Sequence, residues 1–184
     1  MSLPILSVAL RQETDVVLVR QRARRIAGLL GFDAQDQVRI ATAVSEIARN
    51  GVVYAGGAKT EFTIEGVTPP QVLCIRISDR GRGIPNLTEI LEGRYRSATG
   101  MGLGIIGARR LMDHCTIDSA PGVGTTVSLK KRIPPGARRV GSLEIAALAE
   151  TLAREAPQGA LEEVQRQNQE LIAAMSELER RQEE

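Results

Sequence analysis

Apolar residues recur along the first 133 positions with two alternating periods, one typical of strands and one typical of helices. The two-residue period and short apolar runs predict strands, and the period of three to four residues predicts helices. We expect strands at residues 3–10, 60–67, 72–79, 116–119 and 125–132, and helices at 16–30, 34–54, 87–91 and 105–112. Long helices combined with a mostly antiparallel sheet predict an α/β protein, built as a two-layer α/β sandwich.

Capping residues mark the ends of the first two helices. The side chains at residues 13–15 offer N-cap chemistry for the first helix, and Gly31 is expected to end it. Asp33 is the expected cap of the second helix, which should stop at Gly56 and Gly57.

Beyond Ile133 the character of the chain changes. Proline and glycine at 134–136 predict a boundary that divides the chain into a domain over 1–133, a linker with a short helix over 134–159, and a helix over 160–184. In the last part, residues at alternating spacings of three and four form the pattern of a coiled coil: Leu161, Val164, Asn168, Leu171, Met175 and Leu178.

This C-terminal pattern has two interpretations. Asn168 falls at an a position, where a buried asparagine favours a parallel two-stranded register, so the first interpretation is a homodimer joined through this segment. The alternative is a single amphipathic helix packed on its own domain. The pattern continues to the end of the sequence, which predicts a longer parent protein in which this segment is a signalling linker.

Composition excludes several classes of protein. Aromatic residues make up 2% of the chain and the net charge is +2, which argues against base-stacking nucleic-acid readers and polyanionic partners. The two cysteines, Cys74 and Cys115, lie in separate apolar runs and are expected to be reduced thiols in strands. We find no signal peptide and no apolar stretch of about 20 residues that spans a membrane, so the expected location is the cytoplasm.

The first candidate functional residues lie on the second predicted helix. Glu46 and Asn50 are four residues apart and therefore project from the same helical face. An asparagine carbonyl is a suitable ligand for Mg²⁺, and a carboxylate one turn away can act as a general base beside the metal. This pair is common on surface helices, so it indicates a site only together with other motifs.

Three glycine-rich segments supply those motifs. Asp79 ends a predicted apolar strand, where its carboxylate can accept a hydrogen bond from the amino group of a buried base, and glycines follow it. The segment at 100–104 opens a helix, where glycine amides form a phosphate cradle. At 122–126, glycine and threonine lead into a strand. The spacing fits neither a dinucleotide-binding fingerprint nor a Walker loop.

Together the ordered motifs resemble the four nucleotide boxes of the GHKL (Bergerat-fold) ATPase superfamily, which includes histidine kinases, type II topoisomerases, MutL and heat-shock chaperones. The resemblance implies the histidine-kinase-like ATPase fold, with ATP and Mg²⁺ as cofactors and Asn50 as the metal ligand. It also implies that the loop between Gly83 and Gly100 is a mobile ATP lid. The residues that it places around the nucleotide are Asn50, Asp79, Gly81, Gly83, Ile84, Gly100, Gly102, Leu103, Gly104 and Thr125.

Within the superfamily, the segments at 40–50 and 107–113 are most similar to RsbT-like and anti-sigma-factor serine/threonine kinases. That resemblance implies a switch kinase whose substrate is a STAS-domain partner in a bacterial partner-switching pathway. By the same analogy Glu46 is the catalytic base, and Arg94 and Arg96 contact the γ-phosphate. His114 lacks a phosphoacceptor motif, which argues against a self-sufficient histidine kinase.

Two functions therefore stay open. The first is an ATP-dependent protein serine/threonine kinase. The second is an N-terminal nucleotide-binding regulatory or sensor module of a larger signalling protein, such as a histidine kinase, with the coiled coil leading to an output domain outside this sequence.

Overall fold

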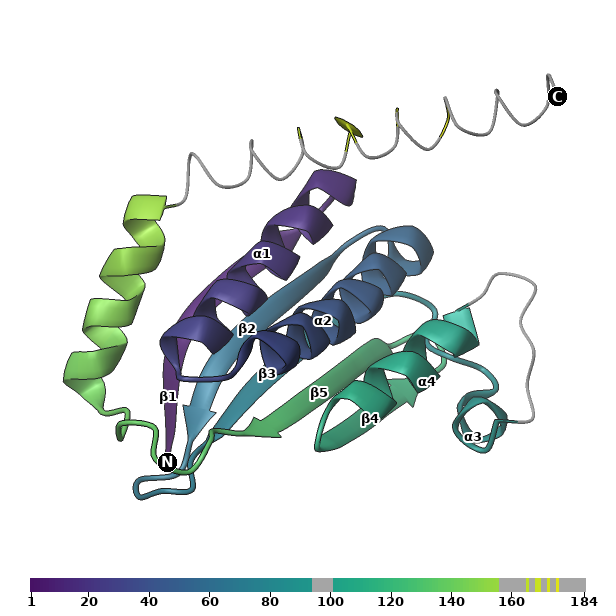
Figure 1. Ribbon diagram of the computed structural model, residues 1–184. Helices are drawn as coiled ribbons and strands as arrows, with labels where there is room; N and C mark the ends of the chain where they lie inside the picture. Colours follow the sequence, from purple (N-terminus) through teal and green to yellow (C-terminus); the bar gives the residue numbers. More distant parts are fainter. Residues whose placement is uncertain (94–100, 156–164, 166–167, 170–171, 173–174, 176–184) are drawn as a thin grey trace, which may run out of the picture.

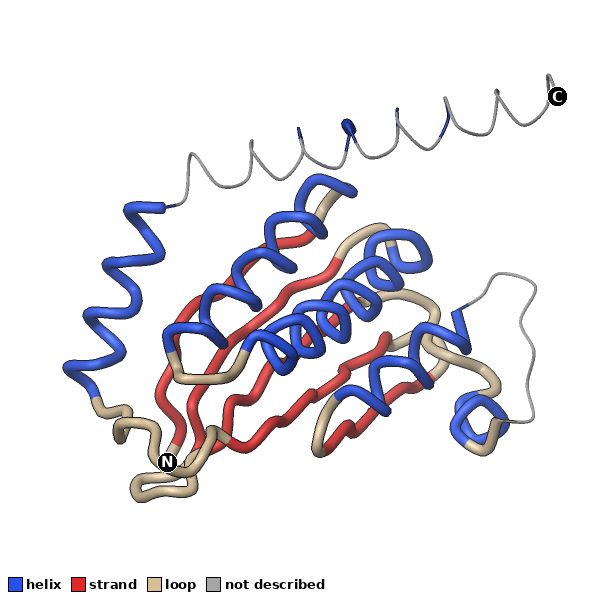
Figure 2. Tube along the Cα trace, viewed as in Figure 1, coloured by secondary structure: helices blue, strands red, loops and turns tan. Residues whose placement is uncertain are grey.

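Three helices lie on one face of a five-stranded antiparallel sheet in the computed structural model (Figure 1). The structure describes residues 1–93, 101–155, 165, 168, 169, 172 and 175. The strand order is β1-β2-β3-β5-β4, and Figure 2 shows the helical layer in front of the sheet. The elements are β1 (Ser2–Leu10), α1 (Glu13–Leu29), α2 (Ala34–Ala55), β2 (Ala58–Glu65), β3 (Val72–Asp79), α3 (Leu87–Leu91), α4 (Met101–Leu111), β4 (His114–Ala120) and β5 (Gly124–Arg132). The predicted two-layer α/β sandwich is confirmed.

Element boundaries differ from the predictions at helix starts. α1 begins at Glu13, three residues early, because Gln12 is the N-cap and the Asp15 carboxylate accepts the backbone N–H groups of Arg11 and Gln12 at 2.8 and 3.1 Å. The N-cap is therefore Gln12 and none of residues 13–15, although Asp15 does contribute to the capping of this helix. Asp33 does cap α2, accepting from the backbone N–H of Asp36 at 2.7 Å.

The start of α4 also lies earlier than predicted, at Met101 instead of residue 105. The sequence analysis placed the glycine-rich segment 100–104 immediately before the helix. In the structure Gly102 and Gly104 are helical, and the absence of a side chain on Gly104 lets α4 approach α2 closely. A Cβ atom on Gly104 would lie 3.2 Å from Oε2 of Glu46.

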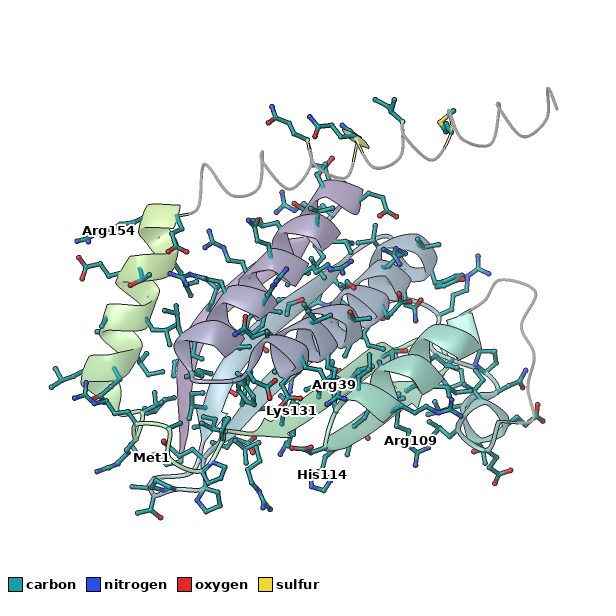
Figure 3. The ribbon with its side chains drawn as sticks, in the orientation of Figure 1. Met1, Arg39, Arg109, His114, Lys131 and Arg154 are labelled. Atoms are coloured by element: carbon teal, nitrogen blue, oxygen red, sulfur yellow. The ribbon has the colours of Figure 1, made fainter. Side chains whose placement is uncertain are left out.

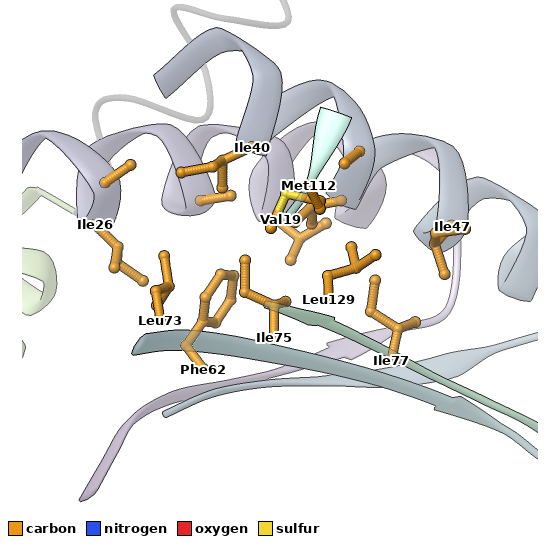
Figure 4. Packing of buried hydrophobic residues seen from close by; sticks show 14 of the residues in the cluster. Val19, Ile26, Ile40, Ile47, Phe62, Leu73, Ile75, Ile77, Met112 and Leu129 are labelled. Atoms are coloured by element: carbon orange, nitrogen blue, oxygen red, sulfur yellow. The ribbon is translucent and has the colours of Figure 1, made fainter. Parts of the chain in front are cut away.

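The core between the layers is aliphatic. Figure 4 shows the inward side chains of the central strands, such as Phe62, Ile75 and Leu129, packed against Ile26 and Ile40 of α1 and α2. These residues are almost completely buried, and each large aliphatic side chain stabilises the fold by about 1.5–3 kcal/mol. Apolar packing therefore fixes α2 over the centre of the sheet.

Cross-strand register sets which side chains meet at each end of the sheet. At one end, Asp79 is paired with Thr125, and Thr125 is paired with Ser119. At the other end, Lys131 reaches Asp36 and Asp113, each at 3.7 Å, and Figure 3 shows it close to Arg39 of α2. This ionic network holds the far end of the helical layer, away from the row that begins with Asp79.

Both cysteines lie in strands, as predicted, and both are free. Burial raises the pKa of the Cys74 thiol, and burial also raises that of Cys115. A thiol with a raised pKa is less often a thiolate, so neither side chain is set up as a nucleophile.

The segment predicted as a linker, residues 134–159, is described as far as residue 155. A helix over residues 142–155 lies beside α1 at the β1 side of the domain (Figure 1). Its Leu148 and Leu152 belong to the buried cluster. Arg22 donates to the Leu152 carbonyl at 2.8 Å, and Arg25 forms two bonds of 2.8 Å to Glu155. The hydrogen bond from Arg25 lowers the pKa of the Glu155 carboxyl, so this ion pair persists into mild acid.

A buried glutamine anchors the connection to this helix. The side-chain amide of Gln71 donates to the Val140 carbonyl at 2.9 Å and accepts from the Val140 N–H at 2.8 Å. It also donates to the Gly66 carbonyl at 3.0 Å. One side chain therefore joins the β2–β3 turn to the segment that leads to the helix over 142–155.

Replacing Gln71 with alanine is expected to loosen this segment. The substitution leaves buried backbone groups of Val140 without partners, at a cost of about 1–3 kcal/mol. Limited proteolysis should then cleave between residues 134 and 155 at least tenfold faster than in the wild type, and thermal unfolding should shift downward. Exposed Gln35 is the matched control. Equal cleavage rates in Gln71→Ala and Gln35→Ala would contradict the anchoring role.

The predicted coiled coil and homodimer lie largely outside the described residues and stay predictions. Arg94, Arg96 and Gly100 are also outside them. Within the described part of the chain, no helix is long and apolar enough to cross a membrane.

Candidate functional site

The α2 helix carries the first two site residues on the side that faces α4. Oε1 of Glu46 accepts from the Arg49 guanidinium at 3.4 Å, and the Glu46 side chain is 37% exposed. Asn50 lies one turn further on, and both side chains lie within 4 Å of the position that a Cβ on Gly104 would take. Glycine at 104 therefore leaves the α2 side chains room beside α4.

The Asn50 amide is incompletely satisfied. Its Nδ2 atom is buried and has no hydrogen-bond partner among the described residues. A buried polar group without a partner costs about 1–3 kcal/mol, so such groups in native proteins need an explanation. Since Asn50 also lines a cavity, an acceptor atom of a bound ligand at this position is a direct explanation.

Asp79 lies across the cavity from α2, at the end of β3. Its Oδ1 atom accepts the backbone N–H of Gly81 at 2.9 Å and that of Thr125 at 3.2 Å. Within the described residues no bond is found to its Oδ2 atom, which remains available as an acceptor. The two backbone bonds fix the orientation of the carboxylate.

Glycines let the loop after β3 pass close to its neighbours. Gly83 has φ of 78°, and a Cβ there would lie 2.5 Å from the Ala120 carbonyl oxygen. A Cβ on Gly81 would lie 2.6 Å from Cβ of Ala55 at the end of α2. Both positions therefore exclude larger residues, and both hold the loop against the end of β4 and α2.

One polar residue of this region was missed by the sequence analysis. Ser119 accepts the backbone N–H of Ile84 at 2.7 Å, and its hydroxyl lies 3.0 Å from that of Thr125. Ser119 is brought to this position by the register of β4 and β5. The only signal in the sequence is its place near the end of a strand that precedes the Gly-Thr-Thr segment.

These elements enclose a cavity of about 390 Å³, within the size range of small-molecule sites. Its apolar side chains include Ile47, Ile77, Ile105 and Val127, and its polar ones include Asp79. An apolar slot with a fixed carboxylate at one end suits the flat ring of a purine whose amino group meets Asp79.

The structure brings most of the predicted site residues together. Those that line the cavity are Asn50, Asp79, Gly81, Gly83, Ile84 and Thr125. Glu46 and Gly104 lie beside Asn50, although neither lines the cavity. Gly102 and Leu103 are in the first turn of α4, with side chains outside the description. Lining residues that the sequence analysis did not select include Tyr54, Arg82 and Pro121.

His114, the sole histidine, begins β4 at the end of the strand opposite Ser119 and is exposed. Figure 3 shows it near the end of the sheet where Lys131 lies. It does not line the cavity, and the expectation that it is not a phosphoacceptor stays a prediction.

The residues present fit a nucleotide with a divalent cation. Asn50 offers an amide oxygen to a hard cation, and its buried Nδ2 atom, which has no partner among the described residues, can donate to an oxygen of the ligand. The first turn of α4 contributes N–H groups beside it, which suit phosphate. The described residues contain no group of three or more His, Cys, Asp or Glu side chains that could hold a metal ion.

The fold thus defines a protein of the two-layer α/β class, with a cavity between α2, the end of β3 and the loop that follows it. Residues 35–135 match the family described as histidine kinase-, DNA gyrase B-, and HSP90-like ATPase. The chain belongs to this family, and the predicted superfamily is confirmed.

Two relatives show which proteins of this family the chain is similar to. The chain is 40% identical over 126 residues to the serine/threonine-protein kinase RsbT of Bacillus subtilis, covering 67% of this chain and 93% of RsbT. It is 30% identical over 99 residues to an anti-sigma F factor of Bacillus licheniformis, covering 51% of this chain and 68% of that protein. The predicted similarity to RsbT and anti-sigma factors is confirmed.

Among solved structures, the RsbU and RsbW domains of a Mycobacterium tuberculosis protein match with a TM-score of 0.49 and 20% identity. The match covers 74% of this chain and 35% of that one.

Proposed function

We propose that this protein is a Mg·ATP-dependent serine/threonine kinase that phosphorylates a STAS-domain partner in a bacterial partner-switching pathway. The observation that carries the proposal is the position of Glu46. It lies one turn from Asn50, beside the cavity and partly exposed, so a hydroxyl on another protein can approach its carboxylate. The 40% identity to a serine/threonine-protein kinase supports the same chemistry.

Each part of the cavity has a role in this proposal. ATP supplies the phosphoryl group, and Mg²⁺ neutralises charge on the phosphates. Asp79 accepts a hydrogen bond from the adenine amino group, and Asn50 holds the cation through its amide oxygen. The amides at the start of α4, near Gly102 and Gly104, bind phosphate oxygens. The apolar lining excludes water from around the base.

Glu46 acts on the acceptor side. One of its oxygens is bonded to Arg49, which orients the carboxylate, while the other lies beside Gly104. The free oxygen accepts the proton of the attacking serine or threonine hydroxyl. Phosphoryl transfer depends mostly on alignment and charge neutralisation, so an oriented carboxylate beside the metal is sufficient protein chemistry.

A phosphotransfer assay tests the proposal. The purified chain is incubated with Mg²⁺, γ-labelled ATP and STAS-domain proteins from the same genome. We propose that the reaction takes place in the cytoplasm. We expect label on one STAS protein and none on its variant with alanine at the acceptor serine or threonine. ATP binding without transfer to any STAS protein would contradict the proposed substrate.

The helix over residues 142–155 favours a second candidate. It packs on α1 and carries the chain onward from the domain, and RsbT aligns with only 67% of this chain. In this alternative the domain is a nucleotide-binding module that passes a signal through a C-terminal coiled coil to an output domain. A nucleotide-dependent change in amide-hydrogen exchange at residues 142–155, without phosphotransfer, would favour it.

A further inference from the structure

Another cavity lies at the opposite end of the sheet from Asp79, between the β2–β3 turn and the segment that follows β5. Figure 1 shows these two segments side by side next to the N-terminus. The volume of the cavity is about 420 Å³, within the size range of small-molecule sites. It shares no lining residue with the cavity that Asn50 and Asp79 line, so the two sites are separate.

Prolines supply much of the wall of this second cavity. They come in two pairs, one in the β2–β3 turn and one after β5: Pro69, Pro70, Pro134 and Pro135. A proline ring fixes its own φ and has no side-chain freedom to lose on binding. Proline segments also pack well against aromatic rings. The walls are therefore rigid and suited to a planar apolar ring.

Hydrogen bonds hold the two walls together without a ligand. The backbone N–H of Ile133 donates to the Gln71 carbonyl at 2.9 Å. The Gln71 side chain, which lines the cavity, is bonded to backbone groups of Gly66 and Val140. The cavity is thus formed in advance, which lowers the cost of ordering the chain when a ligand binds.

Two arginines bring positive charge to the cavity. Arg132 ends β5, Arg138 follows the second proline pair, and both residues are exposed. Neither guanidinium has a hydrogen bond or an ion pair within the described part of the chain. None of the residues that line the cavity is acidic. Two cations at one cavity without an acidic partner attract an anion.

The carboxylates closest to these arginines in the fold are bonded elsewhere. Oδ2 of Asp113 accepts the backbone N–H of Arg132 at 2.7 Å. The Glu144 carboxylate accepts the Gly141 N–H at 2.9 Å, and backbone N–H groups lower the pKa of this carboxyl more than Arg138 does. Both arginines therefore keep their guanidinium N–H donors for a ligand.

We propose that this cavity binds a small anion carried on an apolar ring, such as an aromatic carboxylate or a ring-bearing phosphate ester. The ring packs against the prolines, and the Arg132 and Arg138 guanidinium groups donate to the anionic oxygens, which suit their planar fork. One wall belongs to the β2–β3 turn and the other leads to the helix over 142–155, so the bound ligand fastens that segment to the sheet. The inference is independent of the proposed function.

Amide-resolved NMR titration of the full chain tests the site with four probes: phenyl phosphate, benzoate, benzyl alcohol and inorganic phosphate. We expect at least one ring anion to shift the amide signals of Gln71, Ile133 and Ala137, with a Kd below about 1 mM. Benzyl alcohol lacks the charge and inorganic phosphate lacks the ring, so each should bind at least about fivefold more weakly. The tighter of the two ring anions identifies the head group.

Two results of this titration would overturn the inference. The first is that both ring anions, at about 10 mM, leave these three amide signals unshifted or shift only those of the other cavity, such as Gly81. The second is that benzyl alcohol binds as tightly as the ring anions, because the charge would then not be recognised.

Arg132→Gln and Arg138→Gln test the contacts to the anion. Each side chain is exposed and has no partner among the described residues, so the fold should be unaffected, as thermal unfolding can verify. Each substitution should weaken binding of the ring anion about tenfold. Arg76→Gln is the matched control, since Arg76 is exposed on β3 and does not line the cavity. Equal affinities in all three variants would overturn the inference.

Limited proteolysis tests whether the ligand fastens the segment after β5. At a concentration of about ten times its Kd, the ring anion should slow cleavage between residues 134 and 155 about tenfold in the wild type. At the same concentration it should slow cleavage of Arg132→Gln only about twofold, because the affinity is lower. A wild-type cleavage rate that does not change with ligand would overturn the fastening of this segment.

Discussion

Asn50→Ala is expected to weaken Mg·ATP binding by about 100-fold or more, because it removes the proposed protein ligand of the cation. The folded domain should not lose stability. The Nδ2 atom of Asn50 is buried without a partner among the described residues, so the amide contributes little to the fold in the absence of ligand. Thermal unfolding of the nucleotide-free variant should therefore occur at or above the wild-type temperature.

The experiment combines titration calorimetry at fixed Mg²⁺ with thermal unfolding. Asn168→Ala is the matched control, because Asn168 is exposed on a segment that follows the domain. ATP should raise the unfolding temperature of the wild type and of Asn168→Ala, but not that of Asn50→Ala. An unchanged ATP affinity in Asn50→Ala would exclude Asn50 as the metal ligand.

Glu46→Gln is expected to reduce phosphotransfer by about 10²- to 10⁴-fold, the usual contribution of a general base. Glutamine keeps the size and hydrogen-bonding capacity of the side chain but cannot accept the substrate proton. Since Glu46 does not line the cavity, ATP affinity should stay within about twofold of the wild type. Loss of transfer with retained binding separates a catalytic role from a binding role.

Glu150→Gln provides the comparison for this substitution. Glu150 is also an exposed glutamate whose carboxylate accepts from an arginine one turn away, Arg154. If the Glu46 carboxylate serves only to hold Arg49, the two variants should behave alike. Equal phosphotransfer rates in both would therefore remove Glu46 from the mechanism.

The sequence predicted the two-layer fold because local patterns determine most of it. A short apolar run indicated β3, and Asp33 marked the start of α2 at the correct residue. The ordered glycine motifs indicated the family, and Asp79 and Asn50 do line one cavity. Their roles toward ATP remain predictions.

Other features depend on contacts between distant residues. Ser119 reaches the site through the register of β4 and β5, which neither strand specifies alone. The packing of the helix over 142–155 depends on pairs separated by 130 positions, such as Arg25 with Glu155. The start of α4 was also predicted too late. Glycine has a low helix propensity, and the close packing that places it in this helix cannot be seen in the local sequence.

The attachment of the helix over 142–155 has a mechanical consequence. Residue 155 is held by Arg25, and Leu152 by Arg22, so tension applied to the chain beyond that point is transmitted sideways into the middle of α1. The same tension does not act directly on β5, because the hydrogen bonds of Gln71 hold Val140, which lies between β5 and the helix over 142–155, against the β2–β3 turn. α1 connects through a short turn to α2, the helix that carries Glu46 and Asn50. The shortest path by which force passes from the segment beyond residue 155 to α2 therefore runs through two arginines on α1.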